Sequence, residues 1–201
     1  MNNRKKIKEA AYTIIFMVVM TVVCVGAVSV IYQQSKGRID LNQEMFVRKA
    51  VLQAAGILPE KADAAKISEV FQAEVKEVGK GKEKYYKVKN GSYVFPVTGT
   101  GLWGKIDAVV GLDKNLKTIA GISFTDNNET PGLGARITES WFCNQFRNKK
   151  GPMSFVPEGT KNEADNEFDQ ITGATITSNA VKDMVNRVLK DAPERIAGGD
   201  K

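Results

Sequence analysis

The longest apolar stretch of the chain lies near its N-terminus. Residues 10–32 read AAYTIIFMVVMTVVCVGAVSVIY, twenty-three residues without a charged side chain. About 20 such residues in a helix cross the hydrocarbon core of a bilayer. A cleavable signal peptide is the competing interpretation, but its apolar region has about 7–15 residues and ends at a cleavage site of small residues. The exit Ile31-Tyr32-Gln33-Gln34 offers no such site, so we expect a retained transmembrane helix.

Beyond residue 43 the apolar positions take the spacings of a globular domain. Helical spacing predicts helices over 44–55, 64–75 and 178–190, the last with Ser178 as its N-cap. Shorter periods predict a hairpin over 85–95 with a type I′ turn at Asn90-Gly91, and a second strand pair over 105–112 and 117–124. There is no repeat of strand, helix and strand with a Gly-x-Gly-x-x-Gly turn, which argues against a Rossmann or flavodoxin-like sheet. The pattern predicts an α+β fold with a mainly antiparallel sheet and flanking helices.

These elements divide the chain into five expected parts. They are a basic flank (1–9), a transmembrane helix (10–32), a linker (33–43), one folded domain (44–190) and a C-terminal tail (191–201). Four basic residues precede the span and two follow it closely: Arg4, Lys5, Lys6 and Lys8, then Lys36 and Arg38. The positive-inside rule therefore predicts a single-pass protein of the cytoplasmic (inner) membrane, with its N-terminus in the cytoplasm and its domain on the periplasmic or extracellular side.

The distribution of charge changes how the basic composition is interpreted. The chain of 201 residues has 29 basic and 23 acidic residues, and residues 1–39 hold six of the bases and one of the acids. The remainder is nearly neutral, with 23 basic and 22 acidic residues. The basic excess thus lies beside the span, where it contacts anionic membrane lipid, and it does not indicate nucleic-acid binding. About 160 residues outside the membrane are enough for one domain with a hydrophobic core.

Two scarce residue types limit the chemistry. The chain has no histidine, which removes the usual general base, the Ser-His and Cys-His nucleophile pairs, and histidine metal ligands. A conventional hydrolase and a metal site are therefore not expected. The only cysteines are Cys24, inside the span, and Cys143, so no disulfide can close within the domain. We expect Cys143 to be a packed apolar residue.

Residues 169–178 contain the most informative motif, DQITGATITS. Gly173 and Ala174 leave the Thr175 hydroxyl unshielded by side chains, and the segment lies just before a predicted helix. A helix start offers unpaired backbone N–H groups and the positive end of the helix dipole, which suits a phosphate ester on Thr175. An ordinary polar loop that caps a helix is the alternative.

The motif Asp-x-x-(Ser/Thr)-Gly-Ala-Thr-x-Thr-Ser resembles the flavinylation motif of the FMN-binding domain family. Two further segments resemble the same family in the same order: GTGLWG over 99–104 and ETPGLG over 129–134. The resemblance implies that Thr175 carries FMN through a phosphoester bond, made by a separate magnesium-dependent flavin transferase that uses FAD. Thr175 is then a modification acceptor, and no residue of this chain is expected to be catalytic.

The resemblance also suggests the remaining cofactor-binding residues. We expect Thr130 and Leu133 to contact the isoalloxazine ring, and Glu129 either to hydrogen-bond the ring or to hold its loop. The other candidates are Gly134, Asp169, Thr172, Gly173 and Ala174. Asp169 is expected to position the acceptor loop or to serve recognition by the transferase, with a solvated surface carboxylate as the alternative. The family often has His two positions before the Glu, where this chain has Asn127. Trp103 and Trp141 are expected in the core, with an aromatic contact near the flavin as the alternative.

One membrane helix followed by one flavin domain is similar to the layout of the Rnf-complex G subunit and of the C subunit of the sodium-translocating NADH:quinone oxidoreductase. This similarity implies an electron-carrying subunit of an ion-translocating membrane oxidoreductase, not catalytic alone, whose partners are the other subunits. The short chain favours the Rnf type, which transfers electrons from ferredoxin to NAD⁺. The sequence Leu102-Trp103-Gly104 instead favours the quinone-reducing type. A membrane-anchored binding or scaffold domain without flavin is the hypothesis from a different class.

Overall fold

The computed structural model describes residues 2–160 and 164–199, which form two compact units, residues up to Glu44 and residues from Met45 onward. The first unit consists of the N-terminal part of α1 (Asn2–Ala54). Among the described residues, α1 is the one helix that is long and apolar enough to cross a membrane; its most apolar window has a mean hydropathy of 2.9 and no buried position. The helix continues through residues 33–43, so the linker expected there is helical, and the helix expected over 44–55 is the end of α1.

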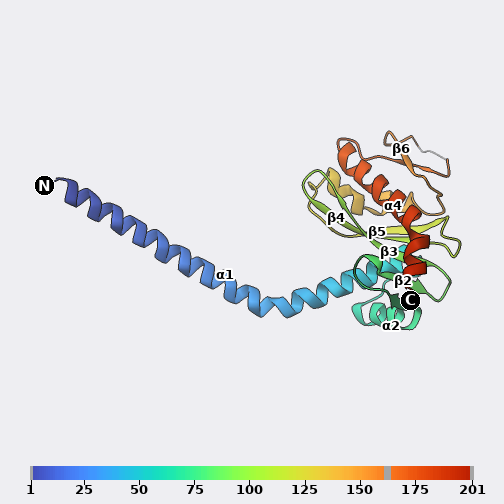
Figure 1. Cartoon of the computed structure of the whole chain (residues 1–201), viewed down its shortest axis with the longest axis horizontal. Helices are drawn as coiled ribbons and strands as arrows, with labels where there is room; N and C mark the ends of the chain where they lie inside the picture. The colour runs from blue at the N-terminus through green and yellow to red at the C-terminus, as the bar shows by residue number, and fades with distance from the viewer. Residues whose placement is uncertain (1, 161–163, 200–201) are drawn as a thin grey trace. The chain divides into compact units, whose positions relative to one another are not determined.

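The second unit holds the remaining elements (Figure 1). Its helices are α2 (Ala64–Glu74), α3 (Ser140–Asn144) and α4 (Thr175–Gly199), with short 3₁₀ segments η1 (Gly81–Glu83) and η2 (Gly134–Thr138). Its main strands are β1 (Val75–Val78), β2 (Tyr85–Val88), β3 (Tyr93–Thr100), β4 (Lys105–Leu112) and β5 (Ile119–Asn127). Two short strands follow, β6 (Ser154–Val156) and β7 (Glu167–Asp169). Of the tail expected over 191–201, residues 191–199 belong to α4, and residues 200–201, like residue 1 of the flank, lie outside the described residues.

The five main strands form one antiparallel sheet in sequence order, so the predicted α+β class is confirmed. The predicted hairpin of β2 and β3 is present. The prediction of a type I′ turn is wrong, because such a turn needs positive φ at both Asn90 and Gly91, and only Gly91 has it (φ 90°). The Gly91 N–H closes the turn on the Val88 carbonyl at 2.9 Å. Strands β6 and β7 pair in parallel as a separate two-stranded sheet.

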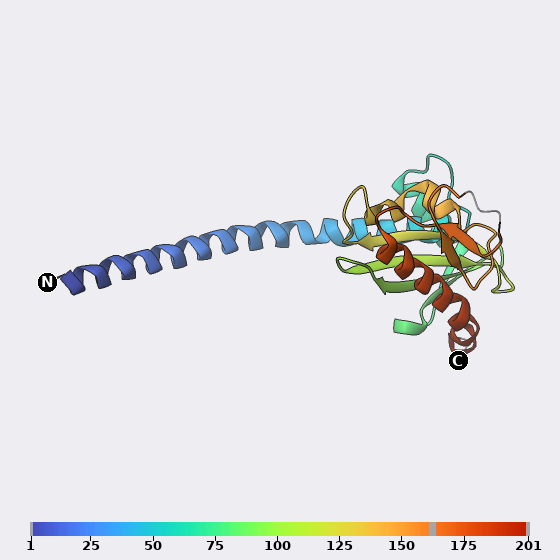
Figure 2. The same cartoon turned by 90° about the horizontal axis from the view of Figure 1, so that it is seen from above.

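The sheet is covered on both faces because successive strand residues point to opposite sides. On one face Val94 and Val109 pack with residues from the end of α1, including Val51 and Ala54. On the other face lies the larger core, in which α4 and α3 contribute to the packing. Both views show α4 crossing the sheet at an angle to the strands (Figures 1 and 2). This second face carries the segments that form the candidate site.

The end of α1 approaches the sheet closely. A Cβ on Gly111 would overlap the Ala54 carbonyl oxygen, and one on Gly121 would lie 3.0 Å from the same atom. Glycine at these two strand positions therefore permits direct contact between helix backbone and sheet.

Candidate functional site

The segment after β7 turns sharply into α4. Gly173 adopts a φ of +78°, a conformation that favours glycine. Helix α4 begins at Thr175, three residues before the expected N-cap, so the prediction for Ser178 is wrong. The Ser178 hydroxyl instead accepts the Ile171 N–H at 3.1 Å and holds the turn from inside the helix.

The first turn of α4 leaves backbone donors for a ligand. Its first backbone bond runs from the Ser178 N–H to the Ala174 carbonyl at 3.0 Å. The N–H groups of Thr175, Ile176 and Thr177 precede this bond, as in any helix start. The Thr175 side chain is exposed, with Gly173 and Ala174 before it. An exposed hydroxyl and three backbone donors therefore share one helix terminus, which is the arrangement that stabilises a phosphate group.

Glu129 links the three sequence motifs. Its side chain is only 6% exposed, and one carboxyl oxygen accepts the Trp103 N–H at 3.0 Å. The other oxygen accepts the hydroxyl of Thr177, in the first turn of α4. The Asn127 side chain accepts the Glu129 N–H at 3.1 Å, so an amide shapes the loop where the family often has histidine. Of the two roles expected for Glu129, this geometry matches holding the loop.

Two motif glycines make this arrangement possible. A Cβ on Gly101 would lie 2.5 Å from a Glu129 carboxyl oxygen. A Cβ on Gly134 would lie 2.5 Å from the other oxygen and 2.7 Å from the Thr177 hydroxyl. No real Cβ is tolerated at such distances, so each glycine is required for the buried carboxyl group to reach its partners.

The three motifs enclose a cavity of about 400 Å³, a size suited to a small cofactor. Its lining comprises Leu102, Trp103, Glu129, Thr130, Leu133, Gly134 and residues 173–177. Several of its apolar side chains are solvent-exposed, with Trp103 at 68%, Ile176 at 56%, Leu102 at 54% and Leu133 at 44%. Large exposed apolar side chains around a cavity that also contains a few polar groups commonly mark a binding site.

Most of the expected site residues meet at this cavity: Glu129, Thr130, Leu133, Gly134, Gly173, Ala174 and Thr175. Thr172 and Asp169 are not part of its lining. The Thr172 N–H donates to Glu158 at 2.7 Å, and Asp169 accepts the Gly159 N–H at 2.7 Å. Asp169 is 9% exposed, which argues against the alternative of a solvated surface carboxylate.

Four residues of the cavity lining were not among the expected site residues: Leu102, Trp103, Ile176 and Thr177. Trp103 was expected in the core, and this expectation is wrong because the side chain projects into solvent beside the cavity. The sequence did contain a signal for this exposure. Leu102 and Trp103 are large apolar residues inside a glycine-rich segment, and their glycine neighbours have no side chains to bury them. Cys143, in contrast, is buried as expected, and burial raises the pKa of its thiol to about 11. Within the described part of the chain, no cluster of three or more His, Cys, Asp or Glu side chains could hold a metal ion.

Comparison with protein families matches residues 101–190 to the FMN-binding domain family. This range includes every residue of the cavity lining. Among solved structures, the fold is similar to that of the C subunit of the Na⁺-translocating NADH-quinone reductase from Parabacteroides distasonis. The TM-score is 0.65 at 21% sequence identity, over 78% of this chain and 94% of that chain. This likeness confirms the fold class.

Two relatives match over most of their length. The chain is 30% identical over 187 residues to the G subunit of the ion-translocating oxidoreductase complex of Methanosarcina acetivorans, covering 90% of this chain and 94% of that protein. It is 32% identical to the G subunit of the Na⁺-translocating ferredoxin:NAD⁺ oxidoreductase complex of Acetobacterium woodii, covering 74% and 76%. The C subunit of the Na⁺-translocating NADH-quinone reductase of Yersinia pestis is 35% identical over 100 residues, but the match spans only 38% of that protein.

Proposed function

Because the chain belongs to the family of G subunits of ion-translocating oxidoreductase complexes and contains an FMN-binding domain, we propose that it carries FMN covalently on Thr175. In this role it transfers electrons within a membrane complex that couples the oxidation of ferredoxin by NAD⁺ to ion transport. The observation that carries the proposal is the position of Thr175, an exposed hydroxyl at the first residue of α4 on the wall of the cavity.

The neighbouring hydroxyls support the choice of Thr175. Thr177 is 1% exposed and its hydroxyl donates to Glu129, so it is neither accessible nor free. Thr172 is exposed but does not line the cavity. Thr175 alone among the three is both exposed and in the cavity lining. A phosphate on its oxygen would meet the N–H groups of the first helical turn, where negative charge is favoured.

The rest of the cavity fits the other end of FMN. The apolar side chains of Leu102, Trp103 and Leu133 offer surface for a flat aromatic ring. Thr130 adds an exposed polar group at the same wall. When bound, FMN supplies the capacity to accept and donate electrons. The residues of this chain hold the flavin ring near the surface, where a partner can approach. The contacts that the cavity lining makes with the ring tune its redox properties.

Covalent attachment suits a domain outside the cytoplasm, because a lost flavin could not be replaced from a cytoplasmic pool. The long apolar helix α1 serves as a single-pass anchor. The basic residues before the span support an N-terminus in the cytoplasm, by the positive-inside rule. The FMN domain then faces the periplasm or the cell exterior, and a flavin transferase on that side completes it.

The coverage of the two matches favours the Rnf type over its quinone-reducing counterpart. Its match covers nearly all of the Methanosarcina G subunit and well under half of the Yersinia C subunit. The second candidate, an anchored scaffold domain that never binds flavin, keeps the same fold. The exposed hydroxyl beside an apolar cavity favours the flavin carrier, since a scaffold needs neither.

Covalent flavin is tested by producing the full chain with and without a flavin transferase and measuring flavin fluorescence of the denatured band on a gel. We expect a fluorescent band that requires the transferase, and Thr175→Ala should abolish it while the domain stays folded. Thr172→Ala is the matched control and should keep the band. A dark wild-type band in the presence of active transferase would favour the scaffold, and fluorescence that persists in Thr175→Ala would move the attachment to another residue.

A further inference from the structure

The acceptor loop, residues 171–174, lies just before α4 and is held by a side chain from a distant segment of the chain. Its Thr172 N–H donates to the Glu158 carboxylate at 2.7 Å. Glu158 lies on the segment between β6 and β7, fourteen residues earlier in the chain. Since Thr172 precedes the acceptor Thr175 by three residues, the position of Glu158 bears on where the acceptor hydroxyl lies.

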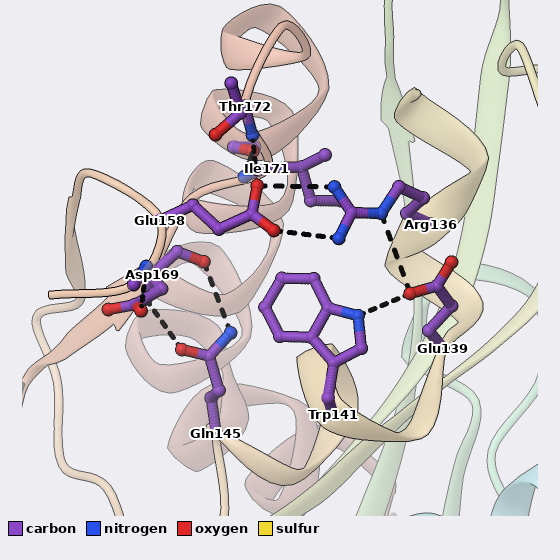
Figure 3. A network of polar contacts seen from close by, with 10 residues as sticks. Arg136, Glu139, Trp141, Gln145, Glu158, Asp169, Ile171 and Thr172 are labelled. Atoms are coloured by element: carbon purple, nitrogen blue, oxygen red, sulfur yellow. Dashed lines mark hydrogen bonds and ion pairs between the residues drawn. The ribbon is translucent and has the colours of Figure 1, made fainter. Parts of the chain in front are cut away.

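Glu158 is also bound to Arg136, on the segment that follows the 129–134 loop. Arg136 contacts both of its carboxylate oxygens, with Nη2 to Oε1 at 2.8 Å and Nη1 to Oε2 at 3.3 Å. Arg136 belongs to η2, which begins at the last glycine of the 129–134 loop. A two-point pair of this kind fixes orientation as well as distance. One carboxylate therefore joins the segment after the 129–134 loop to the acceptor loop (Figure 3).

Each member of the pair is itself held in place. The Arg136 guanidinium lies over the Trp141 ring, 5.2 Å from its centroid, and its Nε is 3.6 Å from a Glu139 carboxylate oxygen. The Trp141 ring N–H donates to the same Glu139 carboxylate. Figure 3 shows these side chains arranged around the guanidinium. The hydrogen bonds from Arg136, and then from Thr172, lower the pKa of Glu158 to about 2, so it is ionised at neutral pH.

Asp169 fixes the segment that carries Glu158. Its Oδ2 accepts the Gly159 N–H at 2.7 Å. Its own backbone is held at both groups by the Gln145 side chain, with the Asp169 N–H donating at 2.7 Å and its carbonyl accepting at 3.2 Å. The motif aspartate thus reaches the acceptor loop indirectly, through Gly159, Glu158 and Thr172.

We propose that Arg136 and Glu158 are positioning residues for flavin attachment, holding the acceptor loop so that the Thr175 hydroxyl is presented to the flavin transferase. This inference rests on the proposed function. Neither side chain lines the cavity, so both act through the Thr172 backbone. The transfer that they assist joins the Thr175 oxygen to the phosphorus of the FMN moiety of FAD, releases AMP, and passes the hydroxyl proton to the transferase or solvent.

The test compares initial rates of flavin attachment to the full chain, with limiting transferase, by fluorescence of the denatured band. A misplaced acceptor lowers the rate steeply, so we expect Glu158→Ala to react roughly 10-fold or more slowly. Glu158→Gln keeps an oxygen that can accept the Thr172 N–H and should lie between wild type and Glu158→Ala. The matched control is Glu69→Ala, which removes an exposed ion pair with Lys66 on α2 and should react at the wild-type rate.

A second readout separates positioning from loss of stability. Hydrogen exchange followed by mass spectrometry should show faster exchange in a peptide spanning residues 170–175 of Glu158→Ala, because the Thr172 N–H has lost its acceptor. A peptide from the middle of α4 should exchange as in wild type, and the melting temperature should stay within a few degrees. Equal acceleration along α4 would indicate general destabilisation and would overturn the positioning role.

The outcomes distinguish this inference from the proposed function. If wild type is labelled on Thr175 and Glu158→Ala is labelled equally fast, the positioning role is refuted and the flavin-carrier function stands. If wild type is never labelled, both fail. Recovery of the rate in Glu158→Gln, together with a local change in exchange, would support the inference.

Discussion

Replacing Glu129 by alanine should destabilise the domain more than any substitution at an exposed carboxylate. The side chain is 6% exposed, and it is the acceptor for the Trp103 N–H at 3.0 Å and for the Thr177 hydroxyl. Alanine leaves both donors without this partner, at a point where three segments distant in sequence meet. The glycines at 101 and 134 make room for this carboxyl group and offer no replacement acceptor.

The magnitude follows from the two donors. A buried donor left unpaired costs about 1–3 kcal/mol. The Thr177 hydroxyl is buried and the Trp103 N–H is partly buried, so Glu129→Ala should lower the free energy of unfolding by roughly 2–5 kcal/mol. For a domain of this size about 1 kcal/mol corresponds to about 2–4 °C, which gives a melting temperature lower by roughly 4–20 °C. Glu129→Gln retains a carbonyl oxygen, and the Thr177 hydroxyl oxygen can accept from its amide, so its loss should stay below about 1 kcal/mol.

The assay is thermal unfolding of the full chain in detergent, followed by the fluorescence of its two tryptophans. Glu60→Ala, at an exposed glutamate, is the control and should melt with wild type. A melting temperature for Glu129→Ala within about 1 °C of wild type would refute the reasoning from unpaired donors. A loss in Glu129→Gln as large as in alanine would show instead that charge, and not hydrogen bonding, stabilises the site.

Three further predictions concern the rest of the domain. Gly111→Ala would press its Cβ against the Ala54 carbonyl oxygen and should lower the free energy of unfolding by about 1–3 kcal/mol, measured by chemical denaturation; an unchanged midpoint would contradict the close approach of α1. In a Cys24→Ser variant, the Cys143 thiol, whose pKa burial raises to about 11, should resist a thiol reagent at pH 8 until the domain unfolds, and rapid labelling of folded protein would contradict its burial. The pKa of Glu158 is about 2 in the folded chain against an ordinary 4.5, so the stability that it contributes is present above pH 4.5 and is lost as pH falls toward 2. The difference in stability between wild type and Glu158→Gln should accordingly shrink over that interval, and a difference that is constant with pH would contradict the ion pair.

Several elements could be predicted because their signals are local. The apolar span over 10–32 depends only on composition and length. Strand β4 matches its predicted bounds of 105–112, and α2 ends within one residue of its prediction. Periodicity of apolar positions determines such elements, since one face of each must pack on the core. The β1 strand and the short β6 and β7 pair were not predicted, because strands of three or four residues carry too little pattern.

The start of α4 illustrates where local reasoning fails. Ser178 has the side chain of an N-cap, yet the helix begins three residues earlier, at Thr175. The Ser178 hydroxyl instead holds the Ile171 N–H across the turn. A capping preference is worth only about 1 kcal/mol, and tertiary contacts easily outweigh it.

The sequence by itself determined the apolar N-terminal helix and the class of fold, and it singled out residues 169–178 as the candidate acceptor segment, because these signals lie in residues that are neighbours along the chain. Only the tertiary structure decided what Glu129, Asp169 and Trp103 do. Glu129 bonds Thr177, which is 48 residues away, Asp169 acts on a different loop from the one that it precedes, and Trp103 lies exposed beside the cavity. The physical reason is that hydrogen bonds and burial are settled between segments brought together by the sheet, and no local pattern records which donor will meet which acceptor.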